Sequence, residues 1–210
     1  NGWLATEKKI LELLSLGLTG VAFSLDSNLS SILQSNRAMS ELQIERSLSN
    51  FEKISQSRIN GEINLELGVI SVITSRNCSV EAVLELLNWA QGNRLDYVKF
   101  NQIFDDGYVG KHSPHLLLNE GHASAIEEIE HSIASLPKVI STNSPNFWNT
   151  IAKTLRGSKL DGGSCGIAGN NAILYHGKYN FCAWMDTHYI GEMNNINEES
   201  ILTSESEFTF

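Results

Sequence analysis

The stretch that decides the fold is residues 65–103, LELGVISVITSRNCSVEAVLELLNWAQGNRLDYVKFNQI. It begins with a β-branched, apolar run, 65–74, of the kind found in buried strands. Ser79 then suits the N-cap of a helix whose apolar residues recur about every 3.6 positions until Gly92. Residues 96–103 read as another strand. This order predicts two parallel strands joined by a crossover helix.

The same order of elements occurs upstream of this stretch. Thr6 suits the N-cap of a helix that ends before Gly17, and residues 20–26, GVAFSLD, read as a buried strand with a polar end. A helix from about 47 to 58 follows. Three strands connected by helices predict an α/β protein. Its strands would belong to a larger parallel sheet, either a partial (β/α) barrel or an open doubly wound sheet.

Polar residues gather where the three expected strands end. In both kinds of sheet, ligands bind at the carboxyl ends of the parallel strands. The candidate site lining therefore consists of the polar residues at those ends: Ser24, Asp26, Thr74, Ser75, Asn101 and Gln102.

The pattern changes after the third strand. A loop containing Gly, His and Pro leads into helices expected over 122–135 and 147–155. A Gly-rich segment then precedes an alternating stretch, 172–182, that reads as a β-hairpin. We expect two domains, residues 1–140 with the parallel sheet and residues 141–210 with the hairpin.

Cys165 and Cys182 form the most specific local signal. Eleven residues separate Cys165 from Gly177, and four separate Gly177 from Cys182. Gly177 suits the tip of the hairpin, so both thiols could lie side by side. Two adjacent thiolates are half of a tetrahedral sulfur site for zinc or an iron–sulfur cluster. Two buried thiols that bind no metal fit the spacing equally well.

The composition limits the partners. The 210 residues carry a formal net charge of −9, and the 15 Lys and Arg residues are scattered, which argues against a nucleic-acid partner. Three cysteines are too few for a disulfide scaffold and indicate a reducing, cytoplasmic compartment. No apolar run reaches the roughly 20 residues that span a bilayer. His112 and His115 lie in a loop without a carboxylate or cysteine at ligand spacing, so a metal role is disfavoured.

Taken in order, these segments resemble radical S-adenosylmethionine (SAM) enzymes that carry a SPASM or twitch domain. The motif Cys-x(9–15)-Gly-x(4)-Cys, which opens such domains, fits the cysteine pair and Gly177. Residues 1–27, NGWLATEKKILELLSLGLTGVAFSLDS, resemble the family's third strand end, third helix and fourth strand. RSLSNFEKI, which starts at Arg46, resembles the entry to the next helix, and residues 65–103 resemble the fifth strand and helix and the sixth strand. The resemblance covers most of residues 1–191.

The resemblance implies positions for a SAM site. Asn1, Ser24 and Asp26 would lie near the ribose and methionyl group of SAM, and Arg46 would approach its carboxylate. Asn101 would lie at the end of the sixth strand, near the adenosine or the substrate. Each residue also has a structural interpretation: a turn for Asn1, a helix cap for Asp26 and a solvated or ion-paired side chain for Arg46.

The resemblance also implies cofactors and partners. A primary [4Fe–4S] cluster would cleave SAM reductively to a deoxyadenosyl radical that takes a hydrogen atom from a peptide or small metabolite. An electron donor such as flavodoxin or ferredoxin would reduce the cluster, and Cys165 and Cys182 would be the metal ligands of an auxiliary cluster. The Cys-x(3)-Cys-x(2)-Cys motif of the primary cluster is absent from this sequence, and no cysteine follows Cys182.

These departures leave alternatives open. We expect the natural protein to extend further towards its amino terminus, and we expect this chain alone to bind SAM weakly or not at all. A non-catalytic remnant of the family, acting as a regulatory or binding protein, is the first alternative. An unrelated sugar or phosphate enzyme on a (β/α) barrel is the second, although no phosphate-binding Gly loop is evident.

Overall fold

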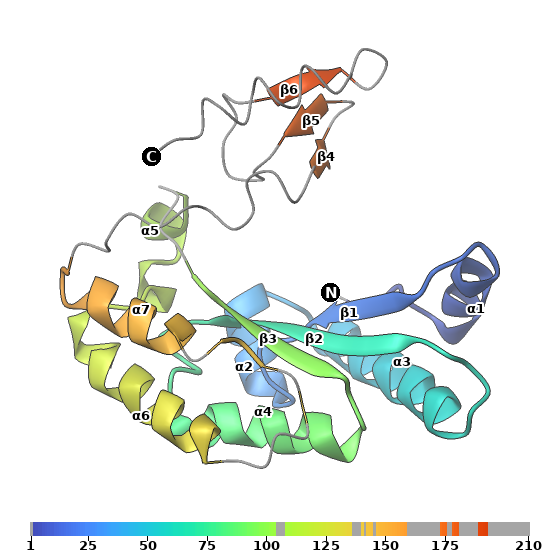
Figure 1. Ribbon diagram of the computed structural model, residues 1–210, viewed down its shortest axis with the longest axis horizontal. Helices are drawn as coiled ribbons and strands as arrows, with labels where there is room; N and C mark the ends of the chain where they lie inside the picture. The colour runs from blue at the N-terminus through green and yellow to red at the C-terminus, as the bar shows by residue number, and fades with distance from the viewer. Residues whose placement is uncertain are drawn as a thin grey trace. The chain divides into compact units, whose positions relative to one another are not determined.

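The structure is a computed structural model that describes residues 2–103, 108–135, 140, 142–144 and 146–158, together with three short strands near the carboxyl end. The chain divides into two compact units, Asn1–Lys159 and Leu160–Phe210. The first unit contains a parallel sheet in the order β1 (Gly20–Ser24), β2 (Glu66–Ile73) and β3 (Tyr97–Gln102) (Figure 1). The three expected strands are therefore adjacent and parallel, as the sequence predicts.

Helices connect the strands as expected. The described helices of the first unit are α1 (Glu7–Ser15), α2 (Ser30–Arg37), α3 (Glu41–Ile59), α4 (Val80–Gly92), α5 (Tyr108–His112), α6 (Ala123–Ala134) and α7 (Asn146–Leu155), with short 3-10 turns at Pro114–Leu116 and Glu120–His122. Thr6 and Ser79 cap α1 and α4 by accepting hydrogen bonds from backbone nitrogens three residues later, as predicted.

The third helix begins earlier than the sequence pattern predicts. Ser40 and Gln43 form a capping box, in which each side chain bonds to the other residue's backbone nitrogen. The helix therefore starts at Glu41, where we expected a start near 47. The expectation failed because the first turns of α3 are mostly polar and their apolar Leu42 is 54 % exposed, so the helical periodicity is weak there.

The two faces of the sheet differ in burial. Phe23, Val69 and Val98 occupy one row across the three strands and are at most 2 % exposed. They pack into the core with helix residues such as Phe51, whose ring meets that of Phe23 edge-on at 5.2 Å. In Figure 1, α3 and α4 lie along this side of the sheet.

The opposite face carries the residues that point away from these helices. Ser24, Ile70 and Lys99 form one row on this face, and all three are partly exposed. One row nearer the start of the strands, the ring of Tyr97 lies against Gly68, where a Cβ atom would come within 2.2 Å of it. Because Ser24, Ile70 and Lys99 are partly exposed, this is the more open face of the sheet in the described part of the chain.

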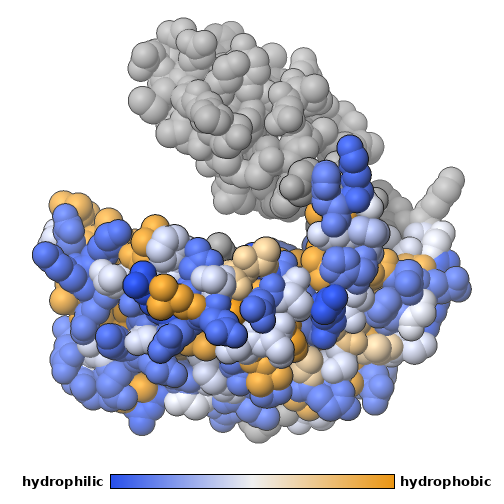
Figure 2. Space-filling view, turned by 180° about the vertical axis from the view of Figure 1, so that it is seen from behind, coloured by the Kyte–Doolittle hydropathy of each residue, from blue (hydrophilic) through white to orange (hydrophobic). Residues whose placement is uncertain are grey.

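The two edges of the sheet also differ. The side chain of Asn143 covers the outer edge of β3, because it accepts from the backbone nitrogen of Phe100 at 2.7 Å and donates to its carbonyl at 2.8 Å. No described strand pairs with the outer edge of β1. Leu11 on α1 and Leu16, which caps that helix at its carboxyl end, are 47 % and 78 % exposed, and Figure 2 shows apolar residues among hydrophilic ones at that end of the unit.

The second unit contains a small antiparallel sheet. β4 (Ile173–Tyr175) pairs with β5 (Lys178–Asn180), which confirms the expected hairpin, and β5 pairs with β6 (Tyr189–Glu192). Cys165, Gly177 and Cys182 lie outside the described residues. The identity of this unit as a SPASM or twitch domain therefore stays a prediction.

The division between the units falls later than the expected boundary at residue 140. α7 packs against α6, and its Trp148 ring lies 5.1 Å from that of Phe100 on β3. This helix therefore belongs to the core of the first unit, which extends to Lys159.

Candidate functional site

A buried carboxylate follows the end of β1. The last backbone hydrogen bond between β1 and β2 runs from Leu25 N to Ile70 O at 3.0 Å. Beyond it, Val72 N donates to Asp26 Oδ1 at 2.9 Å. The Asp26 side chain thus takes the place of a backbone acceptor in the hydrogen bonding between β1 and β2. Asp26 is only 4 % exposed, which means that its charge requires a partner.

Arg37 supplies that partner. Its Nε donates to Asp26 Oδ2 at 2.9 Å and its Nη2 to Oδ1 at 2.5 Å, which is the two-bond fork of a strong arginine–carboxylate pair. Arg37 is the last residue of α2, and Ala38 ends that helix in the left-handed region at φ 49°. The Arg37 side chain is 17 % exposed and that of Asp26 is 2 % exposed. The pair therefore buries its acid and leaves part of its base accessible.

A turn after β2 closes the other side of the site. Thr74 and Asn77 are 2 % and 3 % exposed, and Asn77 Oδ1 accepts from both Thr74 N and Thr74 Oγ1, at 2.7 and 3.0 Å. Ser75 joins this turn to a neighbouring loop, because its backbone nitrogen donates to Leu116 O and its hydroxyl to His115 O. The carboxyl ends of β1 and β2 are thus tied together by side chains.

The structure brings some of the expected site residues together and leaves others apart. Ser24 and Asn101 lie on the open face, opposite Ile70 and Val72 of β2 in the register. Arg46 does not join them: its side chain is exposed on α3 and forms no hydrogen bond or ion pair with the described residues. Asn1, Cys165 and Cys182 lie outside the described part of the chain.

Sequence reasoning missed two residues of this site, Arg37 and Asn77. One signal could have found the arginine, since Arg37 is the only charged residue between positions 27 and 40. A single charge within a polar, otherwise neutral segment that follows a strand-end aspartate is a candidate partner for it. Nothing local distinguishes Asn77, because its role depends on contacts with Asp26, far away in the sequence.

The remaining metal and thiol candidates carry no site in the described part of the chain. No group of three or more His, Cys, Asp or Glu side chains there could hold a metal ion. Burial raises the pKa of the Cys78 thiol to about 11, so it stays protonated at neutral pH and is a poor ligand. His122 and His131 instead bond to Asn119 and to the carbonyl of Glu127 within their own helical turns.

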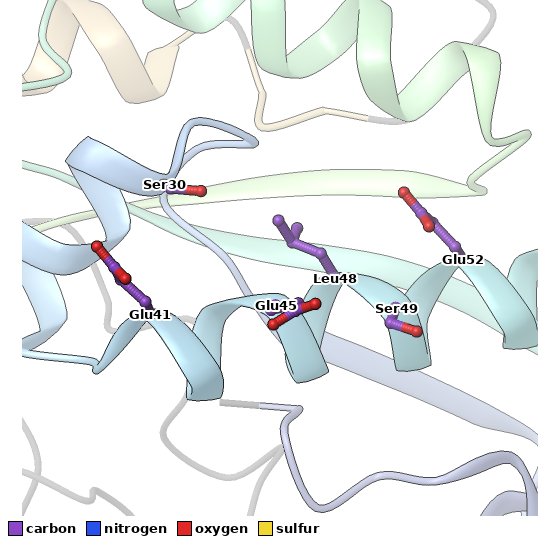
Figure 3. A pocket seen from close by; sticks show the side chains of 6 residues that line it. All are labelled: Ser30, Glu41, Glu45, Leu48, Ser49 and Glu52. Carbon is purple, nitrogen blue, oxygen red and sulfur yellow. The ribbon is translucent and has the colours of Figure 1, made fainter.

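A separate hollow of about 520 Å³ lies beside α3. Figure 3 shows its lining on α3, with one residue contributed by the start of α2: Ser30, Glu41, Glu45, Leu48, Ser49 and Glu52. Three carboxylates give this hollow a negative potential, which disfavours an anionic ligand. It shares no residue with the strand-end site.

Comparison with known proteins shows similarity at the level of fold. No model of a protein family and no curated protein matches the chain. Among solved structures, native anSMEcpe with bound AdoMet matches with a TM-score of 0.64 at 16 % identity, over 99 % of this chain and 56 % of that one.

Two further structures of the same protein agree. Native anSMEcpe with bound AdoMet and the Kp18Cys peptide gives a TM-score of 0.61 at 16 % identity, over 99 % of this chain and 57 % of that one. A histidine-tagged form of anSMEcpe with bound AdoMet gives 0.63 at 15 % identity, over 99 % and 54 %.

The likeness confirms the expected fold class. At this identity it concerns the fold alone, and the chain spans little more than half the length of the structures it matches. Within the described residues, every helix is too short or too polar to span a bilayer. The first unit is an α/β structure with a partial barrel of parallel strands, similar in fold to anSMEcpe.

Proposed function

We propose that this chain is part of a radical SAM enzyme that modifies a peptide, and that it binds SAM at the carboxyl ends of β1 and β2. The observation that carries the proposal is the partly exposed Arg37 fork held by the buried Asp26 carboxylate. Such a fork recognises a carboxylate, and SAM presents one on its methionyl group. The fold supports the same ligand, because the similar structures contain AdoMet.

The residues at this edge fit SAM in their chemistry. Arg37 has five N–H groups, and Asp26 accepts from two of them. Among the described residues, no acceptor bonds to the remaining three, and the buried side-chain nitrogen of the preceding residue, Asn36, also lacks an acceptor. A ligand carboxylate would satisfy these donors. The role that the resemblance gives to Arg46 therefore passes to Arg37.

Other residues would position the rest of the ligand. Ser24 and Asn101 offer a hydroxyl and an amide on the open face of the sheet, within reach of a ribose or an adenine. Bound SAM would supply the radical chemistry of this enzyme class. The residues of this chain would bind and orient it, while the ligands of the primary [4Fe–4S] cluster are not among its three cysteines.

The unpaired edge of β1 supports a role within a larger protein. The outer backbone groups of Gly20, Ala22 and Ser24 have no strand partner among the described residues, and Ala22 is exposed. A parallel sheet is normally covered on both faces, and an unpaired edge presents backbone groups with which a further strand can pair. Further strands of a barrel would pair at this edge.

A peptide substrate fits the proposal because one similar structure holds a peptide.

A second candidate is a SAM-binding protein without radical chemistry. The observation that favours it is the Arg37–Asp26 pair, because an arginine can bind a ligand carboxylate without any cluster. Iron and sulfide analysis of the protein expressed anaerobically from its complete reading frame separates the two. Several iron and sulfide ions per chain support the enzyme, and their absence with SAM still bound supports the second candidate.

The SAM site is tested in the same protein by calorimetry. Replacing Arg37 with Ala should raise the SAM dissociation constant by about 10- to 100-fold, because charge-assisted hydrogen bonds contribute roughly 1.5–3 kcal/mol. Arg46→Ala is the control and should leave it unchanged. Circular dichroism and iron content establish that each variant is folded. An effect of Arg46→Ala without one of Arg37→Ala would contradict the assignment.

A further inference from the structure

Asn77 uses every hydrogen-bonding position of its side chain. Its Nδ2 donates to the carbonyl oxygens of Asp26 and Val72, each at 3.0 Å. Its Oδ1 accepts from the backbone nitrogen and the hydroxyl of Thr74. An amide has two donor hydrogens and two acceptor positions, so all four are satisfied. Asn77 is 3 % exposed and has all its hydrogen-bonding positions filled, so it is a structural junction between β1 and β2.

Two side chains extend the sheet at this junction. Where backbone pairing of β1 with β2 ends, Val72 N donates to the Asp26 carboxylate and Val72 O accepts from Asn77. Both backbone groups that Val72 turns towards β1 are thus bonded by side chains in place of a strand. Asn77 also holds the carbonyl of Asp26, the residue whose carboxylate binds Arg37.

We infer that Asn77 is a positioning residue for the Arg37 guanidinium and acts on it through Asp26. It fixes the backbone of Asp26, and Val72 N fixes the carboxylate, so the fork is held with its outer N–H groups ready for a ligand. For the identity of that ligand the inference rests on the proposed function. For its geometry it rests on the hydrogen bonds alone.

The geometric part is tested without any ligand. Hydrogen exchange at the Arg37 Nε, followed by NMR on the full 210-residue chain, reports how firmly Asp26 holds the guanidinium. Asn77→Ala should raise that exchange rate about tenfold or more, and Asn77→Asp should do the same because it keeps the acceptor but loses both donors. Asn93→Ala is the matched control, since Asn93 bonds to the Trp89 carbonyl at the end of α4.

Asn77→Ser serves if the alanine variant does not fold, because a hydroxyl keeps one donor and should give a smaller rise. An Arg37 exchange rate that stays unchanged in the folded Asn77 variants would overturn the inference. An equal rise in Asn93→Ala would also overturn it, since the effect would then be general loosening.

The functional part uses SAM itself and the complete protein. Asn77→Ala should raise the SAM dissociation constant about tenfold while the iron content stays that of the wild type. If wild-type protein does not bind SAM but the Arg37 exchange responds, the proposed function fails and the positioning role stands. If wild-type protein binds SAM and Asn77→Ala binds it equally well, the role of Asn77 towards the ligand is refuted.

Discussion

The two ends of β2 carry the same kind of aspartate–arginine pair, but the two pairs serve different purposes. At the carboxyl end, Asp26 accepts from Val72 N and pairs with Arg37. At the amino end, Asp96 accepts from Leu67 N at 2.8 Å and pairs with an arginine of α3 at 2.6 Å. In both places, an aspartate beside a neighbouring strand binds a backbone nitrogen of β2 and an arginine.

Each arginine uses two of its five N–H groups, but Arg37 donates from Nε and Nη2 and leaves Nη1 without an acceptor among the described residues. Arg58 at the amino end donates from Nη2 to Asp96 and from Nη1 to the Arg94 carbonyl, so the protein uses both arms. Arg37 directs its described bonds to Asp26 alone. The Asp26 side chain is 2 % exposed and that of Asp96 is 37 % exposed. The amino-end pair therefore serves stability, and the carboxyl-end pair can also serve a ligand, as expected of the two ends of parallel strands.

The largest expected effect on stability comes from the buried acid. Asp26→Ala leaves Arg37 without its partner and Val72 N without its acceptor, and the loss should be about 3–5 kcal/mol in the free energy of unfolding. Urea denaturation of the chain measures it. A loss below about 1 kcal/mol would mean that water replaces the carboxylate, and the comparison between the two ends would fail.

Asp96→Ala should cost less, about 1–2 kcal/mol, because the pair at this end is partly solvated and the main loss is one hydrogen bond to Leu67 N. The same denaturation experiment applies. In the complete protein this variant should bind SAM like the wild type, measured by calorimetry. A weaker affinity for SAM would place the ligand nearer the amino end of the sheet.

Cys78 reports the packing of the carboxyl end, since it follows Asn77 directly. With a pKa of about 11 against an ordinary 9.0, its thiolate fraction at pH 8 is about a hundredfold lower than that of a free thiol. Alkylation at Cys78, read by peptide mapping, should therefore be slow in the wild type. It should quicken in Asp26→Ala and stay slow in Asp96→Ala, and equal rates in the two variants would remove the contrast.

The same thiol gives a small pH dependence of stability. Its pKa is raised in the folded state, so its contribution is fully present below about pH 9 and is lost as the pH rises towards 11. In Cys78→Ala, the free energy of unfolding should fall less over this range than in the wild type, as urea titrations at each pH would measure. A fall of the same size in both would show that other groups cause it.

Much of the first unit could be predicted from local patterns. The β-branched runs locate the three strands, and the caps at Thr6 and Ser79 locate two helices, because these signals come from residues close in sequence. The order of strands and helices then implies parallel pairing. The polar residues at the strand ends indicate, for the same reason, the edge of the sheet at which we propose the SAM site.

The sequence marks Arg37 as the only charged residue between positions 27 and 40, but it does not show that Arg37 rather than Arg46 pairs with Asp26. The pairing depends on how the end of α2 packs beside β1, which tertiary contacts set, whereas the start of α3 is marked locally by the Ser40–Gln43 capping box. Asn77 could not be identified from the sequence because its partner Asp26 lies 51 positions away. The cysteine pair lies outside the described residues, so the auxiliary cluster stays a prediction.

The central claim is that the carboxyl-end arginine contacts SAM and the amino-end arginine does not. The direct measurement is the SAM dissociation constant of the complete protein, determined anaerobically by calorimetry, for Arg37→Lys and Arg58→Lys. Lysine keeps the charge but loses the planar fork. We expect Arg37→Lys to raise the constant about tenfold and Arg58→Lys to leave it unchanged. Equal constants for the two variants, whether both unchanged or both raised, would contradict the account.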